Sequence, residues 1–223
     1  MMSGDVLNVY EATVIIASRE DYWVSRSIYS KVKSLFPNTV FVGKKENLES
    51  TLENKKPDYI FFVFWSWKVP SHVISKNNCI SFHTGDLPRD KGGSPLQNQI
   101  LEGRTTTKLT MFKTSEEMDS GDIYLKKDLS LEGDLIDIFK RMDSIAPEMI
   151  EEIIVKKPRP IPQQGKSTQY KRRTPEQSEI DVHMSAKSIF NLVRSLNMDP
   201  YPPAFIKCGD GKKLYILKAR LEE

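Results

Sequence analysis

Short apolar runs alternate with segments of helical period through the first two-thirds of the chain, and this alternation constrains the fold more than any other feature. The apolar runs lie at 12–18, 38–43, 58–65 and 78–83. The helical segments lie at 22–36, 46–56, 71–75 and 94–103, and the last of them ends at Gly103. Strands that alternate with helices form α/β sheets, so we predict a mainly parallel sheet with helices on both faces.

The main domain is expected to continue with two more strands, at 107–113 and 122–129, and a long helix over 133–155. Apolar side chains recur on one face of this helix. They are Leu135, Ile136, Phe139, Met142, Ala146, Met149, Ile150 and Ile153. The main domain therefore covers 1–155, which is long enough to bury a sizeable core.

A basic, proline-containing linker, 156–175, follows the main domain. Its first 18 residues hold seven Lys or Arg and no acid, whereas the rest of the chain sums to −4. Such a run is typical of a solvated linker, of a patch for a phosphorylated small molecule, or of an RNA-binding patch. The residues 176–223 predict a helix and then a hairpin over 204–219, a small subdomain that packs on the main domain.

Composition and motifs exclude several classes of protein. The two cysteines, Cys79 and Cys208, form no CxxC pair and no disulfide framework, so a reduced, cytoplasmic setting is expected. Acidic residues flank the first apolar run, so no signal peptide is expected, and the apolar segment 59–70 is too short to span a membrane. No GxGxxG follows the first strand and no GxxxxGK[ST] occurs, which argues against a dinucleotide site and a P-loop. The three histidines have no metal-ligand spacing, so no metal is expected; they are His72, His83 and His183.

His83 closes the fourth predicted strand and opens the loop HTGDLPRDKGGSP, which is rich in glycine and proline. Ligands of open α/β sheets bind outside the carboxyl ends of the strands, which is where this histidine stands. Ser81 lies two residues before it, and Asp119 lies in a DSGD turn beyond the next strand. A histidine at a strand end is more often structural than chemical. A histidine and an aspartate that pair can serve acid–base catalysis or stabilise an oxyanion.

Three segments resemble the formyltransferases that use 10-formyltetrahydrofolate. SFHTGDLPRDKGGSPLQNQILEG is similar to the family's Asn-x-His strand end, Leu-Pro turn, Gly-rich loop and Pro-hydrophobic-Gln helix start. TKLTMFKTSEEMDSGDIYL resembles its T-x-hydrophobic-Thr strand and Asp-x-Gly-Asp turn. YKRRTPEQSEIDVHMSAKSIF resembles the Arg-Thr-Pro-Glu stretch of the sugar-modifying members. The resemblance begins near residue 58 and implies a Rossmann-like formyltransferase fold.

The family's mechanism implies roles for the residues that match. An amine attacks the formyl carbon, an asparagine and a histidine donate hydrogen bonds to the oxyanion, and an aspartate holds the histidine. His83 and Asp119 match this pair, while Ser81 replaces the asparagine. A serine reaches less far, so a bridging water, a contribution from Asn98, or slow turnover are the alternatives. The resemblance also implies a folate slot with no metal; its residues are Trp65, Ser66, Trp67, Val69, Glu116 and Asp119.

Three acceptors are open: methionyl-tRNA, a ribonucleotide amine, and a nucleotide-linked amino sugar. The tRNA enzymes of this family carry a C-terminal β-barrel domain for which 223 residues leave no room, and a net charge of +3 is mild for binding nucleic acid. The linker favours the sugar enzymes. We therefore expect N-formylation of a UDP- or dTDP-linked 4-amino-4,6-dideoxy sugar for surface glycans, with a pseudaminic acid precursor as the first candidate. The residues expected to hold this sugar are Lys91, Gly92, Gly93, Tyr170, Arg172 and Arg173.

Two further expectations concern partners. Sugar enzymes of this type often pair through the C-terminal subdomain, so a homodimer is expected, without a membrane or nucleic acid partner. Because Ser81 stands where the family has asparagine, a formyltransferase-like protein that binds folate or nucleotide with little activity is the alternative. A formyltransferase acting on another small amine is also open.

Overall fold

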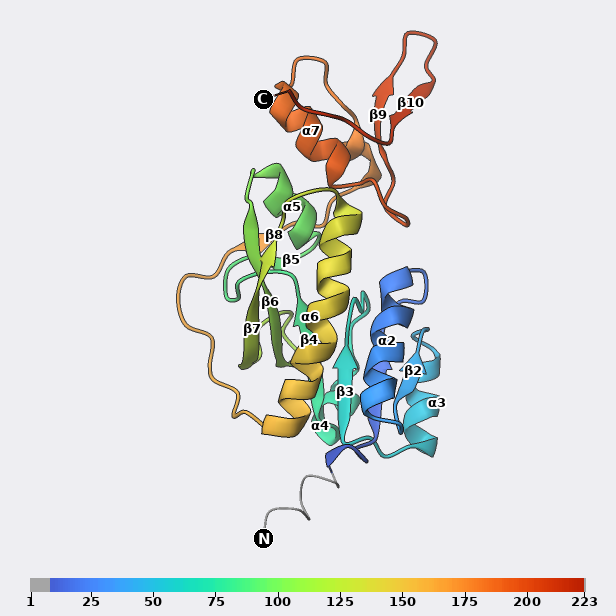
Figure 1. The fold of residues 1–223 in the computed structure, drawn as a ribbon, viewed down its shortest axis with the longest axis vertical. Coiled ribbons are helices and arrows are strands. Elements are labelled where there is room, and N and C mark those ends of the chain that lie inside the picture. Colours follow the sequence, from blue (N-terminus) through green and yellow to red (C-terminus); the bar gives the residue numbers. More distant parts are fainter. Residues whose placement is uncertain (1–8, 223) are drawn as a thin grey trace.

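A computed structural model describes residues 9–222 and confirms the α/β fold (Figure 1). One sheet of six strands has the order β2-β1-β3-β4-β6-β7. The strands are β1 Val14–Ala17, β2 Val40–Val42, β3 Tyr59–Phe62, β4 Cys79–His83, β6 Thr106–Lys113 and β7 Ile123–Ser130. The first four are mutually parallel, while β6 runs antiparallel to both β4 and β7. The sheet is therefore parallel on one side of β4 and antiparallel on the other.

Helices cover both faces of the sheet, as the apolar runs predict. In β1, Val14 and Ile16 face one core while Ile15 and Ala17 face the other, so both faces of the strand are buried. The helices α2 Trp23–Leu35 and α6 Leu135–Lys156 pack on the first core, and α3 Asn47–Asn54 and α4 Ser71–Lys76 pack on the second. In the part of the chain that the structure describes, no helix is long and apolar enough to cross a membrane.

The buried face of α6 differs from the predicted one, because Ile136 is exposed and the buried Ile138 and Ile154 were not predicted. Ile136 is 37% exposed, whereas Ile138 is completely buried. Residues at i, i+3 and i+4 share a helix face, so Leu135, Ile138 and Phe139 point to the sheet together and Ile136 lies one step around the helix. Ile136 was therefore wrongly placed in the buried face.

Pro147 lies inside α6, where it removes the N–H that would bond to the carbonyl of Asp143. A lysine from α2 supplies the missing donor. Lys31 Nζ lies 3.0 Å from the carbonyl oxygen of Asp143 and 2.5 Å from its carboxylate Oδ2. The α2–α6 contact thus includes a polar anchor at the point where the helix ladder is broken.

The linker is ordered against the main domain. Ile161 pairs with Ile123 at the start of β7, and the strand β8 Gln169–Tyr170 pairs in parallel with β5 Lys91–Gly92. This second, two-stranded sheet was not predicted, because neither strand has an apolar pattern. Through it, the linker reaches the loop that follows His83.

The C-terminal elements pack beside α5 Pro95–Leu101 (Figure 1). They are the 3₁₀ helix η1 Pro175–Ser178, the helix α7 Ala186–Arg194 and the hairpin of β9 Ala204–Lys207 and β10 Lys213–Ile216. Their core contains Ile180, Leu192 and Ala204, and Leu101 of α5 packs against it. Arg194, only 8% exposed, donates to the carbonyls of Leu131 at 2.7 Å and Gly133 at 2.9 Å.

The contact of Lys31 with Asp143 predicts a measurable effect on stability. Lys31→Met should lower the free energy of unfolding by about 1–3 kcal/mol, because it leaves a buried carbonyl and a carboxylate without their donor. Urea denaturation measures this change. Pro147→Ala restores the helical N–H, so adding it to Lys31→Met should recover part of the loss. Lys140→Met, at an exposed lysine of α6, is the control. An equal loss of stability in this variant would contradict the role assigned to the contact between Lys31 and Asp143.

Candidate active site

His83 stands at the carboxyl end of β4 and is 7% exposed. Its Nε2 lies 2.7 Å from the carbonyl oxygen of Asp90, and its Nδ1 lies 3.6 Å from Oδ1 of Asp119. The second distance suits an ion pair and is too long for a hydrogen bond. The structure therefore brings together the histidine and the aspartate that the sequence predicts as a pair, from two loops at one edge of the sheet.

Asp119 is held by its backbone and by its second carboxylate oxygen. Its φ is +54°, a left-handed conformation that aspartate tolerates better than most residues. Oδ2 accepts a hydrogen bond from the N–H of Gly92 at 2.9 Å, and the carbonyl accepts one from Gln163 Nε2 at 2.8 Å. These contacts aim Oδ1 at His83 and bring a linker residue, Gln163, to the back of the site.

Ser81, the residue that replaces the family's asparagine, is paired with a second hydroxyl. Its Oγ lies 2.8 Å from Oγ1 of Thr114. One hydroxyl donates to the other, so one of the two protons stays free to be donated elsewhere. Asn98, the alternative donor considered from the sequence, instead points Nδ2 at the carbonyl of Gly93, 3.2 Å away.

A cavity of about 420 Å³, here called the tryptophan cavity, opens beside His83 and Asp119. One side carries Trp65, Ser66, Trp67 and Val69, and the other carries Ser115, Glu116 and Asp119. The rings of Trp65 and Trp67 meet edge to face with centroids 4.7 Å apart. Trp65 Nε1 is buried and has no hydrogen-bond partner among residues 9–222. Every residue expected from the sequence to form a folate slot lines this cavity.

His83 also lines a second cavity of about 330 Å³, here called the tyrosine cavity. Its walls are largely aromatic and apolar; they include Tyr22, Phe64, Phe139, Met142 and Tyr201. The hydroxyl of Tyr22 donates to that of Tyr201 at 3.1 Å, and the 3% exposed Gln97 has an Nε2 without a partner in the described chain. The two cavities share a wall made of Trp65, Ser66, Phe82, His83 and Arg172.

Of the six residues expected to bind the acceptor, three line one or both of these cavities. Gly92 lines the tryptophan cavity, Arg173 lines the tyrosine cavity, and Arg172 lines both. The other three line neither. Lys91 Nζ donates to Ser120 Oγ at 2.8 Å, and the hydroxyl of Tyr170 bonds to Glu102 and Arg104. Burial lowers the pKa of Arg173, whose Nη2 donates to the carbonyl of Gln177 at 2.6 Å.

The Gly-Gly pair of the loop after β4, Gly92 and Gly93, lies against the backbone of the linker. Gly92 has φ +91°, and a Cβ on it would lie 2.4 Å from the carbonyl oxygen of Tyr170. A Cβ on Gly93 would lie 2.5 Å from the Cα of Arg172. Only glycine lets the linker backbone approach this closely. The pair therefore places Arg172 at the two cavities.

Sequence reasoning missed several residues of this site. Thr114 follows β6 and meets Ser81 only because β6 pairs with β4. Tyr22, Gln97 and Tyr201 come from the start of α2, from α5 and from the C-terminal subdomain. Gln97, the buried glutamine directly after Pro95-Leu96, was the one residue whose type could have indicated this site from the sequence. A buried polar side chain on the inner face of a helix needs a hydrogen-bond partner. Between residues 9 and 222, no group of three or more His, Cys, Asp or Glu is arranged to hold a metal ion.

Two family models and the curated relatives that match this chain all carry the names of formyl transferases. Residues 26–144 match the family model "Formyl transferase", and residues 175–223 match "Methionyl-tRNA formyltransferase, C-terminal domain". The methionyl-tRNA formyltransferase of Ehrlichia canis (strain Jake) is 32% identical over 192 residues, which are 81% of this chain and 61% of that protein. The chain thus spans about 60% of the length of the first curated relatives that it matches.

Solved structures with a similar fold include a protein of the same name. A methionyl-tRNA formyltransferase from Clostridium thermocellum has a TM-score of 0.82 and 35% identity, over 92% of this chain and 97% of that chain. HypX from Aquifex aeolicus in complex with tetrahydrofolic acid has a TM-score of 0.79 over 93% of this chain and 38% of that chain, at 20% identity, which shows a shared fold only.

The expectation of a nucleotide-sugar acceptor is wrong. The curated relatives are named methionyl-tRNA formyltransferases, and the C-terminal residues match that family's C-terminal domain. A sugar N-formyltransferase from Shewanella shares the fold at 16% identity, with a TM-score of 0.70 over 96% of this chain and 100% of that chain. The expectation rested on the length of the chain, whereas a chain of similar extent, from Clostridium thermocellum, carries the name methionyl-tRNA formyltransferase.

The contact of Gly93 with Arg172 predicts that a single methyl group displaces the linker. Gly93→Ala should lower the free energy of unfolding by about 1–3 kcal/mol and speed tryptic cleavage after Lys171, because the clash is with backbone that cannot shift cheaply. Gly209→Ala is the matched control: neither glycine has positive φ, and nothing lies within 4 Å of a Cβ at Gly209. Equal cleavage rates in the two variants would contradict this role.

Proposed function

The chain belongs to the formyl transferase family, and on this premise we propose that it transfers a formyl group from 10-formyltetrahydrofolate to the amino group of methionyl-tRNA. The observation that carries the proposal is the position of His83 in the wall shared by two cavities. A group transferase must hold donor and acceptor on either side of the same catalytic groups, and this arrangement suits that need.

The tryptophan cavity suits the folate. A pterin is a flat aromatic ring with hydrogen-bonding edges, and the cavity offers the indole rings of Trp65 and Trp67 together with the polar side chains of Ser66 and Glu116. The bound folate would supply a formyl carbon that an amine attacks, and its own nitrogen would leave with a proton. We assign Trp65, Ser66, Trp67, Val69 and Glu116 to hold it.

His83, Asp119 and the Ser81–Thr114 pair would act at the boundary of the two cavities. His83 turns Nδ1 toward Asp119 while Nε2 donates to the Asp90 carbonyl, so a ring that carries a proton on both nitrogens can donate the Nδ1 proton to the oxygen on which negative charge develops. The free proton of the hydroxyl pair provides a second donor from β4 and β6. Asp119 lies close enough to take up the proton that the attacking amine must lose.

The tyrosine cavity suits the methionyl group. A thioether packs well against aromatic rings, and Phe64, Phe82 and Phe139 stand around Met142 in this cavity. Arg172 and Arg173 stand at its edge, where a guanidinium can bind the phosphate or ribose of the tRNA end. The basic linker thus becomes a candidate contact with RNA, supported by the names of the relatives.

The test is formylation of purified methionyl-tRNA with 10-formyltetrahydrofolate, followed by mass spectrometry of the aminoacyl group. Wild type should form N-formylmethionyl-tRNA, and His83→Gln should lower kcat/KM by about 10²–10⁴-fold through loss of acid–base catalysis. His72→Gln, at an exposed histidine paired with Glu49, is the matched control and should match wild type. A wild-type protein that binds folate and leaves methionyl-tRNA unmodified would sink the proposal.

The hydroxyl pair predicts non-additive mutations. Ser81→Ala and Thr114→Val should each have a modest effect, because the hydroxyl that remains can turn its proton toward the cavity. The double variant should lose about 10²–10³-fold in kcat, the usual effect of removing an oxyanion donor. Single-turnover rates of the three variants measure this. Additive effects of the two single changes would show that the hydroxyls act independently.

A further inference from the structure

The hydrogen bond from His83 to Asp90 determines which ring nitrogen is available for chemistry. A backbone carbonyl only accepts hydrogen bonds, so Nε2, which lies 2.7 Å from the carbonyl oxygen of Asp90, must carry a proton. Nδ1 is then the nitrogen that faces Asp119. The orientation of one carbonyl group thus decides the tautomer of the neutral ring.

The linker holds the peptide unit to which this carbonyl belongs. The N–H of Lys91 is part of the same peptide plane and donates to the carbonyl oxygen of Thr168 at 3.0 Å. The N–H of Asp90 donates to the hydroxyl of Thr168 at 2.9 Å. Thr168 therefore anchors the peptide from the side opposite His83, which prevents the carbonyl from turning away.

The side chain of Asp90 supplies the second anchor. Asp90 has φ +64° and is 1% exposed, so a strained backbone and a buried carboxylate occur in one residue. Its Oδ2 accepts from Arg104 Nη1 at 2.9 Å, and Arg104 is the cation paired with it in the described chain. A buried carboxylate needs such a partner, because an unpaired charge is costly to bury.

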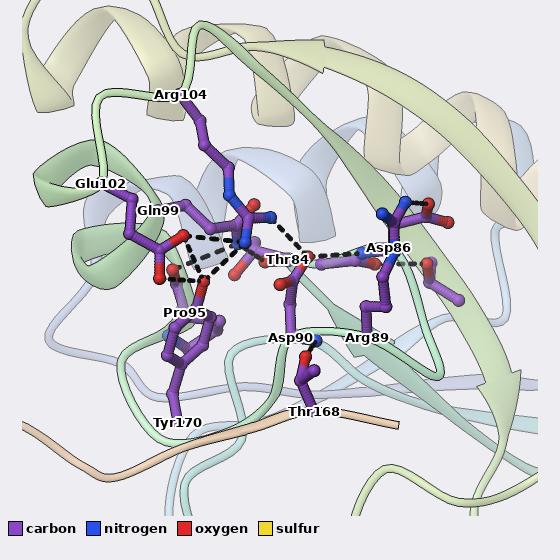
Figure 2. A network of polar contacts seen from close by, with 12 residues as sticks. Thr84, Asp86, Arg89, Asp90, Pro95, Gln99, Glu102, Arg104, Thr168 and Tyr170 are labelled. Atoms are coloured by element: carbon purple, nitrogen blue, oxygen red, sulfur yellow. Dashed lines mark hydrogen bonds and ion pairs between the residues drawn. The ribbon is translucent and has the colours of Figure 1, made fainter. Parts of the chain in front are cut away.

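Arg104 is itself fixed by a second pair of groups, drawn in Figure 2. Its Nη2 lies 2.8 Å from Glu102 Oε2 and 2.9 Å from the hydroxyl of Tyr170, which donates to Glu102. Burial and the hydrogen bond to Glu102 raise the pKa of Tyr170, so the hydroxyl keeps its proton. Tyr170 belongs to the linker, so this network joins the linker, the end of α5 and the loop after β4.

From this geometry we infer that Asp90 is a positioning residue for His83, and that its ion pair with Arg104 and its contacts with the linker hold His83 in the Nε2-protonated form. The inference rests on the proposed function only for its consequence in catalysis. When the linker is docked, the ring presents Nδ1 to Asp119. When the contacts of Asp90 with Arg104 or with the linker are lost, the Asp90 carbonyl can turn away, and the His83 ring no longer prefers the Nε2-protonated form.

The first experiment reads the tautomer directly. Nitrogen-15 NMR of histidine-labelled protein distinguishes the two ring nitrogens, and with three histidines in the chain the spectrum of His83→Gln assigns the resonances. Wild type should show His83 protonated at Nε2. Asp90→Asn, which keeps the size of the side chain and tolerates positive φ, should shift His83 toward a mixture of tautomers. Arg104→Gln should do the same, and Arg104→Lys should restore part of the wild-type state.

Asp86→Asn is the matched control, because Asp86 lies in the same loop but pairs with Arg89 and Lys126, each at 2.6 Å. It should leave the His83 spectrum unchanged. In the formylation assay, Asp90→Asn and Arg104→Gln should lower kcat/KM by about 10- to 100-fold, mainly through kcat, as expected for a misplaced catalytic group. Asp86→Asn should retain the wild-type rate.

The outcomes separate this inference from the proposed function. The NMR measurement needs no substrate, so a protein without formyl transfer to methionyl-tRNA would overturn the proposed reaction and leave the tautomer result standing. A wild-type tautomer in folded Asp90→Asn and Arg104→Gln would overturn the positioning role. If Asp90→Asn does not fold, the His83 tautomer in Arg104→Gln and Tyr170→Phe tests the positioning role instead. Both variants should fold, because the Arg104 side chain is 38% exposed and Tyr170→Phe removes only a hydroxyl.

Discussion

The burial of β4 between β3 and β6 is the constraint on which the site depends. β3 pairs with β4 as far as Ser81 and β6 pairs with it as far as His83, so the strand fixes the backbone of His83 and the groups that act with it must come to the end of this strand. The loop after β4 folds back over the ring so closely that a Cβ on Gly85 would lie 2.9 Å from His83 Nε2. The sheet thus supplies a fixed histidine, and the loops supply its partners.

The linker is part of the site, although it lies about 80 residues further along the sequence than the loop it contacts. It anchors the Asp90 peptide through Thr168, supports the Asp119 turn through Gln163 and brings Arg172 to both cavities. Close packing against Gly92 and Gly93 makes these contacts possible. The C-terminal subdomain follows the linker and packs on α5, the helix that comes after the same loop.

The two cavities differ in the chemistry that they offer. The tryptophan cavity combines indole rings with the carboxylates of Glu116 and Asp119, whereas the tyrosine cavity combines aromatic rings with three arginines, Arg19, Arg172 and Arg173. A donor with a flat heteroaromatic ring, and an acceptor that joins an apolar side chain to a phosphate backbone, would suit this difference. His83 lies in the wall that the two cavities share, where both reactants would meet, and the hydroxyl pair lines the tryptophan cavity.

Local patterns in the sequence determined the sheet and its flanking helices, because strand and helix periods are properties of neighbouring residues. The resemblance of short motifs to a known family, rather than these periods, supplied the His83–Asp119 pair and six of the residues that line the tryptophan cavity. Other features depend on pairs that no local pattern encodes. Thr114 meets Ser81 through the β4–β6 pairing, Lys31 completes the helix broken by Pro147, and the linker strand pairs with β5. The tyrosine cavity, which collects residues from both ends of the chain, and the Asp90 carbonyl that orients His83 were likewise decided only by the tertiary structure, since burial and long-range packing place them.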